Sequence, residues 1–322
     1  MKSHSLDQAV AAIKEHNNFL LSAHVSPEGD CVGSILALDG LLKKLNKNSY
    51  ILCEDPIPES VGFLDNGCWH TLNDGIPDLQ WDVACIADCG DLERIGKVKN
   101  VIQDKSLFII NLDHHVSNRF FGDINYVDSK AAASGEIIYE LFKAFDCSLS
   151  IEDVNQIYVA MSTDTGSFKY SNTTAKTHKI VADLIDCGLD VGTLNEKIYD
   201  NVPKRRLNLF KKFINNIEIL EEGKIACAYL SNKEIEGTGS TKADLEGFVE
   251  YMRSIQGVQI SFLMTEFEGS SKVSFRAIGN NDVCEIAKNF GGGGHVKASG
   301  CTIKLLPMEA KKEILNFIKK TK

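Results

Sequence analysis

At residues 106–115 the chain reads SLFIINLDHH, an apolar run that ends in an acid and two histidines. A short run of this composition is typical of a strand buried on both faces. The same design occurs at residues 19–24 (FLLSAH) and 81–88 (WDVACIAD), where the runs end in His24 and Asp88. Because such runs alternate with helical stretches along the first half of the chain, we predict a parallel α/β sheet.

Polar residues at the ends of parallel strands are expected to meet, because ligands of such sheets bind beyond the carboxyl ends of the strands. Glu28 and Asp30 follow the run that ends in His24, and Asp164 lies in the segment STDTGS at residues 162–167. Convergent carboxylates repel one another unless cations neutralise them. We therefore predict bound metal, with these ligands: His24, Glu28, Asp30, Asp88, His114 and Asp164.

This ligand set is larger than one divalent ion needs, so we expect two ions that share a bridging carboxylate. The set is rich in oxygen, contains imidazole and lacks thiolate. Such ligands favour manganese, with magnesium as the alternative, over structural zinc. Cys31 and Cys89 adjoin the proposed ligands but are assigned no metal role.

These motifs resemble those of the DHH phosphoesterase family. The first family motif is matched by HVSPEGD at residues 24–30, the second by Asp88, the third by Asp113-His114-His115 and the fourth by Asp164. The segment GGGGH at residues 291–295 resembles the signature of the DHHA1 domain, which follows the DHH domain in many members. Glu28 departs from the pattern, because the commoner residue there is Asp, and this puts the metal geometry in doubt.

The resemblance implies an α/β fold with a doubly wound parallel-sheet DHH domain and a smaller α/β DHHA1 domain with a mixed sheet. We expect the metal-binding catalytic domain at residues 1–190, a helical connector at 191–222 and the substrate-binding domain at 223–322. A chain of 322 residues is long enough for two domains, each with its own core. Helices are expected at 33–45, 154–161 and 242–255, among others.

The resemblance also assigns roles to individual residues. One metal is assigned to His24, Glu28 and Asp88, and the other to Asp30, Asp88, His114 and Asp164. His115 is left for the substrate phosphate, and Asp113 is expected to orient a histidine or a backbone turn. Substrate anchoring in the second domain is assigned to Arg276, Gly292, Gly293, Gly294 and His295. Ser117, Asn118 and Ser134 are either phosphate contacts or turn and helix caps.

The activity implied is that of a metal-dependent hydrolase of phosphodiester and phosphomonoester bonds. Such an enzyme degrades very short oligoribonucleotides to mononucleotides and removes the 3'-phosphate of pAp. One alternative is a phosphodiesterase for pApA or cyclic di-AMP. A remoter one is a nucleotide sensor without catalysis, which Glu28 keeps open. A long-strand exonuclease and an inorganic pyrophosphatase are disfavoured.

Composition bears on partners and location. The net charge of −9 gives no sign of the basic surface that long nucleic acids require, so small anionic substrates are expected, with no long duplex partner. The ten cysteines include no Cys-x-x-Cys pair and are interpreted as buried, reduced thiols. No apolar run is long enough to cross a bilayer, and the amino terminus lacks signal-peptide features, so we expect a cytoplasmic protein with no membrane partner. A homodimer is possible.

Overall fold

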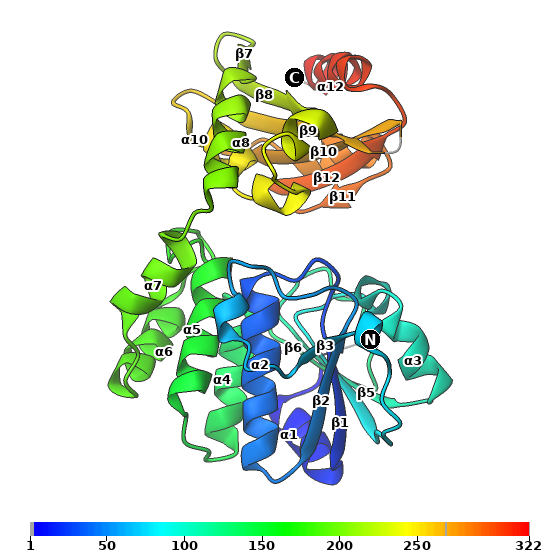
Figure 1. The fold of residues 1–322 in the computed structure, drawn as a ribbon, viewed down its shortest axis with the longest axis vertical. Coiled ribbons are helices and arrows are strands. Elements are labelled where there is room, and N and C mark those ends of the chain that lie inside the picture. Colours follow the sequence, from blue (N-terminus) through cyan, green and yellow to red (C-terminus); the bar gives the residue numbers. More distant parts are fainter. Residues whose placement is uncertain (1–2, 268, 322) are drawn as a thin grey trace. The chain divides into compact units, whose positions relative to one another are not determined.

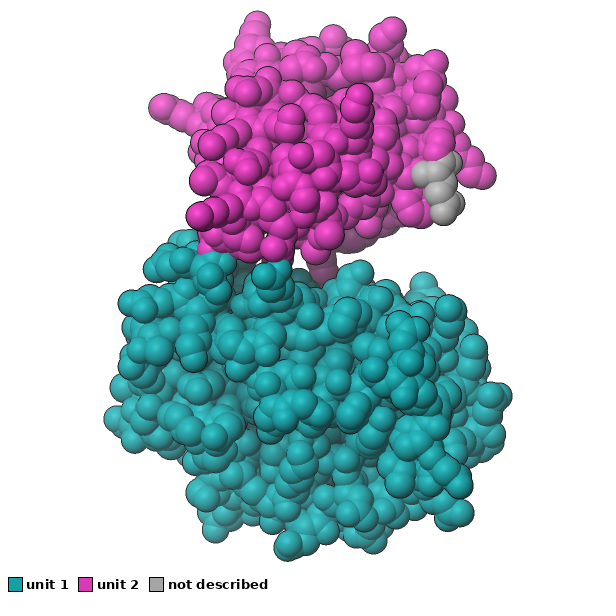
Figure 2. Space-filling view, viewed as in Figure 1, with its two compact units in different colours: residues 1–201 teal, residues 202–322 magenta. Residues whose placement is uncertain are grey.

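The computed structural model describes residues 3–267 and 269–321. The chain divides into two compact units, residues 1–201 and 202–322. Figure 2 colours the two units differently, and Figure 1 is coloured along the sequence. Each unit has its own hydrophobic core and is described by itself.

The first unit is built on a parallel sheet with the order β3-β2-β1-β4-β5-β6. Each pair of neighbouring strands in this sheet is parallel, which confirms the predicted fold class. The chain moves outward from β1 to β3 on one side and from β4 to β6 on the other. The order therefore reverses between β1 and β4, and this topological switch point is where such sheets bind ligands. The strands are β1 Asn18–Ser22, β2 Asn48–Cys53, β3 Trp69–Thr71, β4 Val83–Ala87, β5 Phe108–Asp113 and β6 Ile124–Val127.

Helices cover both faces of this sheet because successive strand residues point to opposite sides. Phe19 and Leu21 pack into the larger core with α2, α4 and α5, whereas Leu20 packs into a second core with α3. The helices are α1 Leu6–Glu15, α2 Gly29–Lys44, α3 Val98–Asp104, α4 Ser134–Ala144, α5 Ile151–Asp164, α6 Ala175–Asp186 and α7 Val191–Tyr199. Short 3-10 turns lie at η1 Gly62–Leu64, η2 Leu72–Asp74 and η3 Leu92–Ile95.

Two helices are longer than the apolar pattern predicts, and both extensions reach the metal-capable residues. The predicted helix 33–45 begins at Gly29, which places Asp30 in the first turn of α2 with Glu28 as its N-cap. The predicted helix 154–161 runs from Ile151 to Asp164, so Asp164 ends α5. Each extension includes an acid of the site, Asp30 or Asp164, which interrupts the apolar pattern.

The second unit contains a mixed sheet with the order β11-β12-β10-β9-β8-β7, as predicted. Strands β8 and β9 are parallel, and the other neighbouring strands of this sheet are antiparallel. The predicted helix 242–255 is wrong as one element, because Gly247 has a φ of 79° and separates η4 Lys242–Leu245 from α10. The strands are β7 Glu218–Leu220, β8 Ile225–Leu230, β9 Ile260–Phe267, β10 Ser270–Ala277, β11 Gly293–Gly294 and β12 Ala298–Ile303. The helices are α8 Lys204–Asn215, α9 Asn232–Glu236, α10 Phe248–Ser254, α11 Val283–Asn289 and α12 Pro307–Thr321.

Residues 191–222, expected as a connector, are shared between the units. Helix α7 belongs to the first unit, and α8 and β7 belong to the second. Within the described part of the chain, no helix combines the length and apolar character that spanning a membrane requires.

Candidate active site

The site begins at the switch point, where the segments that follow β1 and β4 bring His24 and Asp88 together. His24 Nε2 lies 3.5 Å from Asp88 Oδ2, and both residues are buried. Asp88 has a φ of 54°, and its backbone N–H donates to the carbonyl of Leu112. Aspartate adopts this left-handed conformation more readily than most residues, so the turn after β4 is compatible with an acid at this position.

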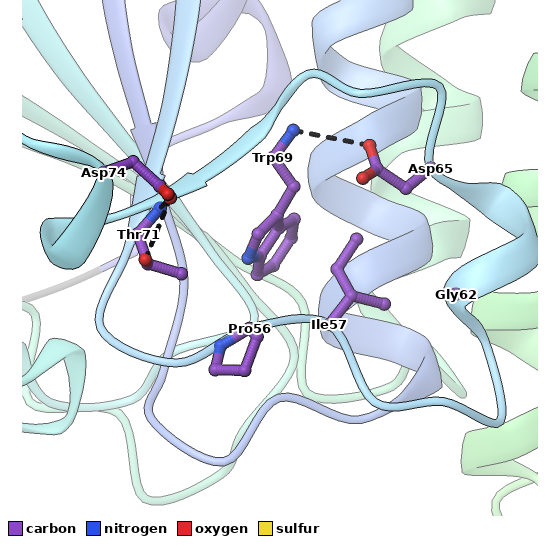
Figure 3. Close-up of a pocket in the computed structure, with 7 residues that line it drawn as sticks. All are labelled: Pro56, Ile57, Gly62, Asp65, Trp69, Thr71 and Asp74. Carbon is purple, nitrogen blue, oxygen red and sulfur yellow. Dashed lines mark hydrogen bonds between the residues drawn. The ribbon is translucent and has the colours of Figure 1, made fainter.

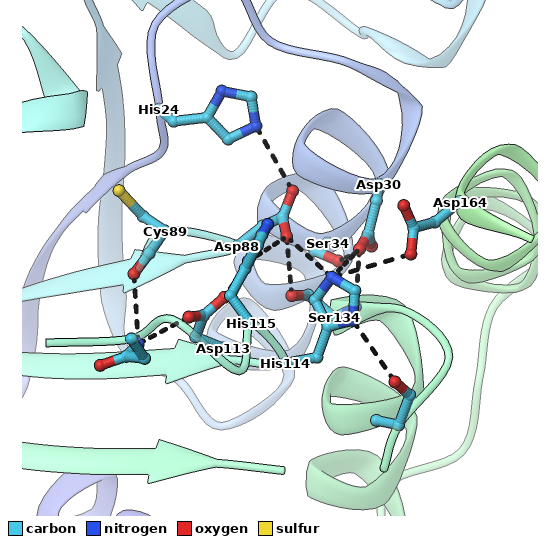
Figure 4. A network of polar contacts seen from close by, with 12 residues as sticks. His24, Asp30, Ser34, Asp88, Cys89, Asp113, His114, His115, Ser134 and Asp164 are labelled. Carbon is cyan, nitrogen blue, oxygen red and sulfur yellow. Dashed lines mark hydrogen bonds and ion pairs between the residues drawn. The ribbon is translucent and has the colours of Figure 1, made fainter. Parts of the chain in front are cut away.

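A second group forms around His114, at the end of β5. Its Nε2 lies 3.6 Å from Asp30 Oδ2, 3.5 Å from Asp88 Oδ1 and 3.7 Å from Asp164 Oδ2. Figure 4 shows these side chains converging from separate loops and helix ends. Asp88 therefore turns one carboxylate oxygen to His24 and the other to His114.

These groups fit divalent cations. His24 turns its Nδ1 to the carbonyl of Val25 at 2.8 Å, and His114 turns its Nδ1 to the carbonyl of Ala131 at 3.3 Å. Both rings turn Nε2 to the acids. His24 Nε2 is buried and has no hydrogen-bond partner among the described residues. Histidines that bind metal characteristically use the second ring nitrogen in this way. Asp30, His114 and Asp164 also present ligand atoms within 4.8 Å of one another.

The pKa values of the site reflect the excess of negative charge. Burial and the charge of Asp88 raise the pKa of Asp30 well above its usual value, and burial raises that of Asp164. Burial disfavours the charged imidazole of His114, but Asp88, Asp30 and Asp164 outweigh it and raise its pKa to about 10. Burial likewise opposes ionisation of Asp88, yet His114 and His24 hold its pKa below its usual range. The site thus attracts positive charge strongly.

Glu28 and Cys31 depart from the predicted ligand set. Glu28 is exposed at the N-cap of α2 and belongs to none of the metal-capable groups among the described residues. Cys31 Sγ instead lies within 4.8 Å of ligand atoms of His24 and Asp88. Burial raises the pKa of the Cys31 thiol well above its usual value, so it remains a protonated, poor ligand for hard cations.

His115 forms a metal-capable group with Asp88 and His114, and a chain of hydrogen bonds holds its ring. Its Nδ1 lies 2.7 Å from Asp113 Oδ1, and Asn118 Nδ2 donates to Asp113 Oδ2 at 2.6 Å. Asp113 and Asn118 are buried, whereas His115 is half-buried. The side-chain amide of Asn118 thus hydrogen-bonds within the chain, whereas Ser117 is exposed. Val116, which lies between His115 and Ser117, is 80% exposed, which is unusual for a large apolar side chain.

In the second unit, Arg276 and the glycines lie on neighbouring parts of the sheet. Arg276, on β10, donates from Nε to Glu250 Oε1 at 2.6 Å. Gly292 packs against the backbone of β12, where a Cβ would come within 2.2 Å of the Gly300 carbonyl oxygen. Gly293 has open space at its Cβ position, and His295 is exposed in the turn between β11 and β12. Close packing alone therefore accounts for Gly292.

Models of two domain families match the chain: the DHH family N-terminal domain at residues 18–165 and the DHHA1 domain at residues 222–321. The chain therefore contains a DHH domain followed by a DHHA1 domain.

Its relatives cover both domains. A bifunctional oligoribonuclease and PAP phosphatase NrnA from Thermus thermophilus is 29% identical over 90% of this chain and 85% of its own length. The Bacillus subtilis protein of the same name is 26% identical over 92% of each chain. The crystal structure of an exopolyphosphatase-related protein from Bacteroides fragilis superposes with a TM-score of 0.91 at 25% identity, over 98% of this chain and 95% of that one.

Three residues of the DHH domain that sequence reasoning missed or misread lie at the site. Arg94, in η3, accepts a hydrogen bond from the Val25 N–H at its carbonyl, and its charge acts on both His24 and Glu28. Ser34 and Ser134 are fully buried and donate to metal-capable carboxylates. Ser134 has no exposed surface for a phosphate, and the N-cap of its helix is Ala133. In the sequence, Ser134 is marked only by its position at the start of a helix.

A separate cavity of about 400 Å³ lies in the DHH domain among residues 56–74 (Figure 3). Trp69 lines it and donates its indole N–H to the carbonyl of Asp55. The carboxylate of Asp55 in turn accepts a hydrogen bond from the Ser26 N–H, in the first DHH motif. None of the predicted metal or substrate residues lines this cavity.

Proposed function

We propose that this chain is a metal-dependent phosphoesterase that degrades very short oligoribonucleotides to mononucleotides and removes the 3'-phosphate of pAp. One observation carries the proposal: Asp88 turns its two carboxylate oxygens to two different imidazoles, His24 and His114, at 3.5 Å each. This is the arrangement expected of a carboxylate shared by two cations. The substrates are those in the names of the NrnA relatives.

The residues that would hold the cations are His24 and Asp88 at one position, and Asp30, Asp88, His114 and Asp164 at the other. Manganese is our first expectation and magnesium the alternative. A pair of such ions supplies an activated water and neutralises charge that develops on the phosphoryl group. Glu28 would join the first position only by moving from its exposed N-cap.

The chain's own residues bind and orient the phosphoryl group. Burial opposes the charge of His115, but the contact with Asp113 outweighs it and raises the pKa of the imidazole. With Nδ1 directed to Asp113, we assign to His115 the role of contacting a phosphoryl oxygen, where a protonated imidazole stabilises negative charge. Asn118 and Asp113 hold the ring in this orientation.

Residues of the second unit are proposed to bind substrate phosphate. Arg276 uses Nε for Glu250 and Nη1 for the Phe275 carbonyl, which fixes the plane of its guanidinium. A guanidinium fixed in this way binds phosphate with little loss of side-chain entropy. The open space at Gly293 and the exposure of His295 support the same assignment.

The experiment is a substrate panel with manganese and then with chelator. A trinucleotide, pAp, pApA and cyclic di-AMP are each incubated with the protein, and mononucleotide and phosphate are measured. The proposal predicts hydrolysis of the trinucleotide and pAp, lost on chelation. Turnover confined to pApA or cyclic di-AMP would indicate the phosphodiesterase alternative. Nucleotide binding without any turnover would indicate the sensor, whose first metal position Glu28 leaves incomplete.

A further inference from the structure

Two buried serines lie behind the metal-capable carboxylates, and they serve different oxygens. Ser34, on α2, donates its hydroxyl to Asp30 Oδ1 at 2.9 Å. Ser134, the first residue of α4, donates its hydroxyl to Asp88 Oδ1 at 3.1 Å. Figure 4 shows both serines beside these acids. Because neither side chain has exposed surface, each acts on the carboxylates and not on a substrate.

Ser134 also contacts the second acid through its backbone. Its N–H donates to Asp30 Oδ2 at 2.7 Å, and the N–H of Gly135 donates to Asp30 Oδ1 at 3.0 Å. The first N–H groups of a helix have no partner within the helix, and the helix dipole favours negative charge there. One residue therefore connects Asp30 and Asp88, which come from segments far apart in the sequence.

Counting acceptor sites separates the two oxygens of Asp30. Its Oδ1 accepts from Ser34 and Gly135, which uses the roughly two lone pairs of a carboxylate oxygen. Among the described residues its Oδ2 accepts from Ser134 alone, and it faces His114 Nε2 at 3.6 Å. Asp88 Oδ1, which also faces His114 Nε2, at 3.5 Å, is likewise held by Ser134. Three carboxylate oxygens face His114 Nε2, and Ser134 holds two of them; the third is Asp164 Oδ2.

We propose that Ser134 is a positioning residue that fixes Asp30 Oδ2 and Asp88 Oδ1 as a pair of ligands for one cation beside His114. The inference rests on the proposed function, since it needs a metal-dependent site. It predicts that the two buried hydroxyls differ in importance although both donate to acids of the site. The Ser134 hydroxyl holds one oxygen of the carboxylate that both metal positions share, whereas the Ser34 hydroxyl holds an oxygen directed at the protein.

Manganese binding tests the inference without relying on turnover. Wild-type protein, Ser134→Ala and the matched control Ser34→Ala are titrated with MnCl₂ by calorimetry, and the electron paramagnetic resonance signal of a spin-coupled manganese pair is recorded. Ser134→Ala should weaken binding of the second ion by about 10–100-fold, the usual effect of removing a partner behind a metal ligand. The spin-coupled signal should disappear in Ser134→Ala and persist in Ser34→Ala. Ser134→Thr, which keeps the hydroxyl, should restore it.

Equal losses in the two alanine variants would overturn the inference, because any buried hydroxyl would then have the same effect. Wild-type binding by Ser134→Ala would also overturn it. If that variant does not fold, Ser134→Thr and Ser134→Val, matched in shape and differing in the hydroxyl, make the same comparison. A wild-type protein that binds no manganese would remove the proposed function and the inference together. If the wild-type protein binds manganese and hydrolyses pAp, a failed prediction for Ser134→Ala overturns the inference alone and leaves the proposed function standing.

Discussion

Helix α2 carries two buried acids with opposite surroundings. Asp39 pairs with Lys43 at 2.6 Å and accepts from the Ser49 hydroxyl at 2.6 Å, so the protein itself neutralises it. Asp30, nine residues earlier, faces one histidine and, within the described residues, accepts hydrogen bonds from neutral donors alone. Burying a charge is costly unless an opposite charge accompanies it. A buried acid that the protein does not pair with lysine or arginine therefore identifies the place where a cation is expected.

The same contrast holds for α5. Its beginning carries buried Asp153, paired with Lys44 at 2.9 Å, and its end carries Asp164 among other acids. Both helices thus direct their unbalanced ends to the carboxyl edge of the sheet. Electrostatic balance, and not burial alone, distinguishes a structural acid from a functional one.

The largest expected effect comes from Asp88→Asn, compared with Asp39→Asn. Loss of the shared carboxylate removes a ligand from both metal positions, so kcat/KM for pAp should fall by at least about a thousandfold. Asp39→Asn should keep its activity and lose about 1–3 kcal/mol of unfolding free energy, because Lys43 and Ser49 lose a charged partner. Steady-state kinetics and urea unfolding measure the two effects. Equal loss of activity in both variants would break the comparison.

Acid should weaken metal binding. A cation requires the unprotonated imidazole, while the neighbouring acids raise the pKa of His114 to about 10 in protein without added metal. At neutral pH each binding event at this position therefore releases a proton, and affinity rises with pH. For one released proton the change is about tenfold per pH unit, or about a hundredfold between pH 6 and 8. Manganese titrations in buffers of different ionisation enthalpy count the protons, and a count of zero contradicts the prediction.

In the second unit the same comparison applies to basic residues. Arg276 forms an ion pair with Glu250 at 2.6 Å and is also proposed to bind substrate phosphate. Arg276→Ala should raise KM for pAp by about 10–100-fold, equivalent to about 1.5–3 kcal/mol for a charged hydrogen bond, with a smaller effect on kcat. Arg205→Ala is the control, because Arg205 pairs with Asp244 elsewhere in the same unit. An unchanged KM in Arg276→Ala would show that its pairing with Glu250 is purely structural.

The smallest effect is expected at Arg94, which is exposed and has no ion pair with the described residues. Its charge acts on His24 and Glu28, so it is placed to attract a phosphate. Arg94→Ala should raise KM about three- to tenfold, or about 0.7–1.4 kcal/mol. Arg119→Ala is matched, because Arg119 is exposed on the same domain and pairs with Asp91 at 3.0 Å. Identical KM values for the two variants would exclude a specific role for Arg94.

The buried parts of the fold were predictable because continuous apolar runs define them. The apolar runs at residues 81–88 and 106–115 contain strands β4 and β5. Strand β3 has only three residues, too few for a recognisable period. The break before α10 depends on the positive φ of Gly247, which one glycine in a helical pattern does not establish.

The site residues were predictable only as a motif. The structure brings His24, Asp30, Asp88, His114 and Asp164 together, but their roles remain predictions. Glu28 fits the motif by position, yet its exposed N-cap location depends on where α2 begins. The contacts of Ser134 with Asp30 and Asp88 could not be predicted, since they join residues 104 and 46 positions apart. Such contacts follow from packing between helices, for which the sequence holds no local signal.

The most direct test is anomalous diffraction at the manganese edge from crystals grown with MnCl₂. The account predicts two peaks that share Asp88, one beside His24 and one beside Asp30, His114 and Asp164. Asp39, with its lysine partner, should have none. Peaks elsewhere, or no peak at the carboxyl edge of the sheet, would contradict the claim that its unbalanced acids form a metal centre.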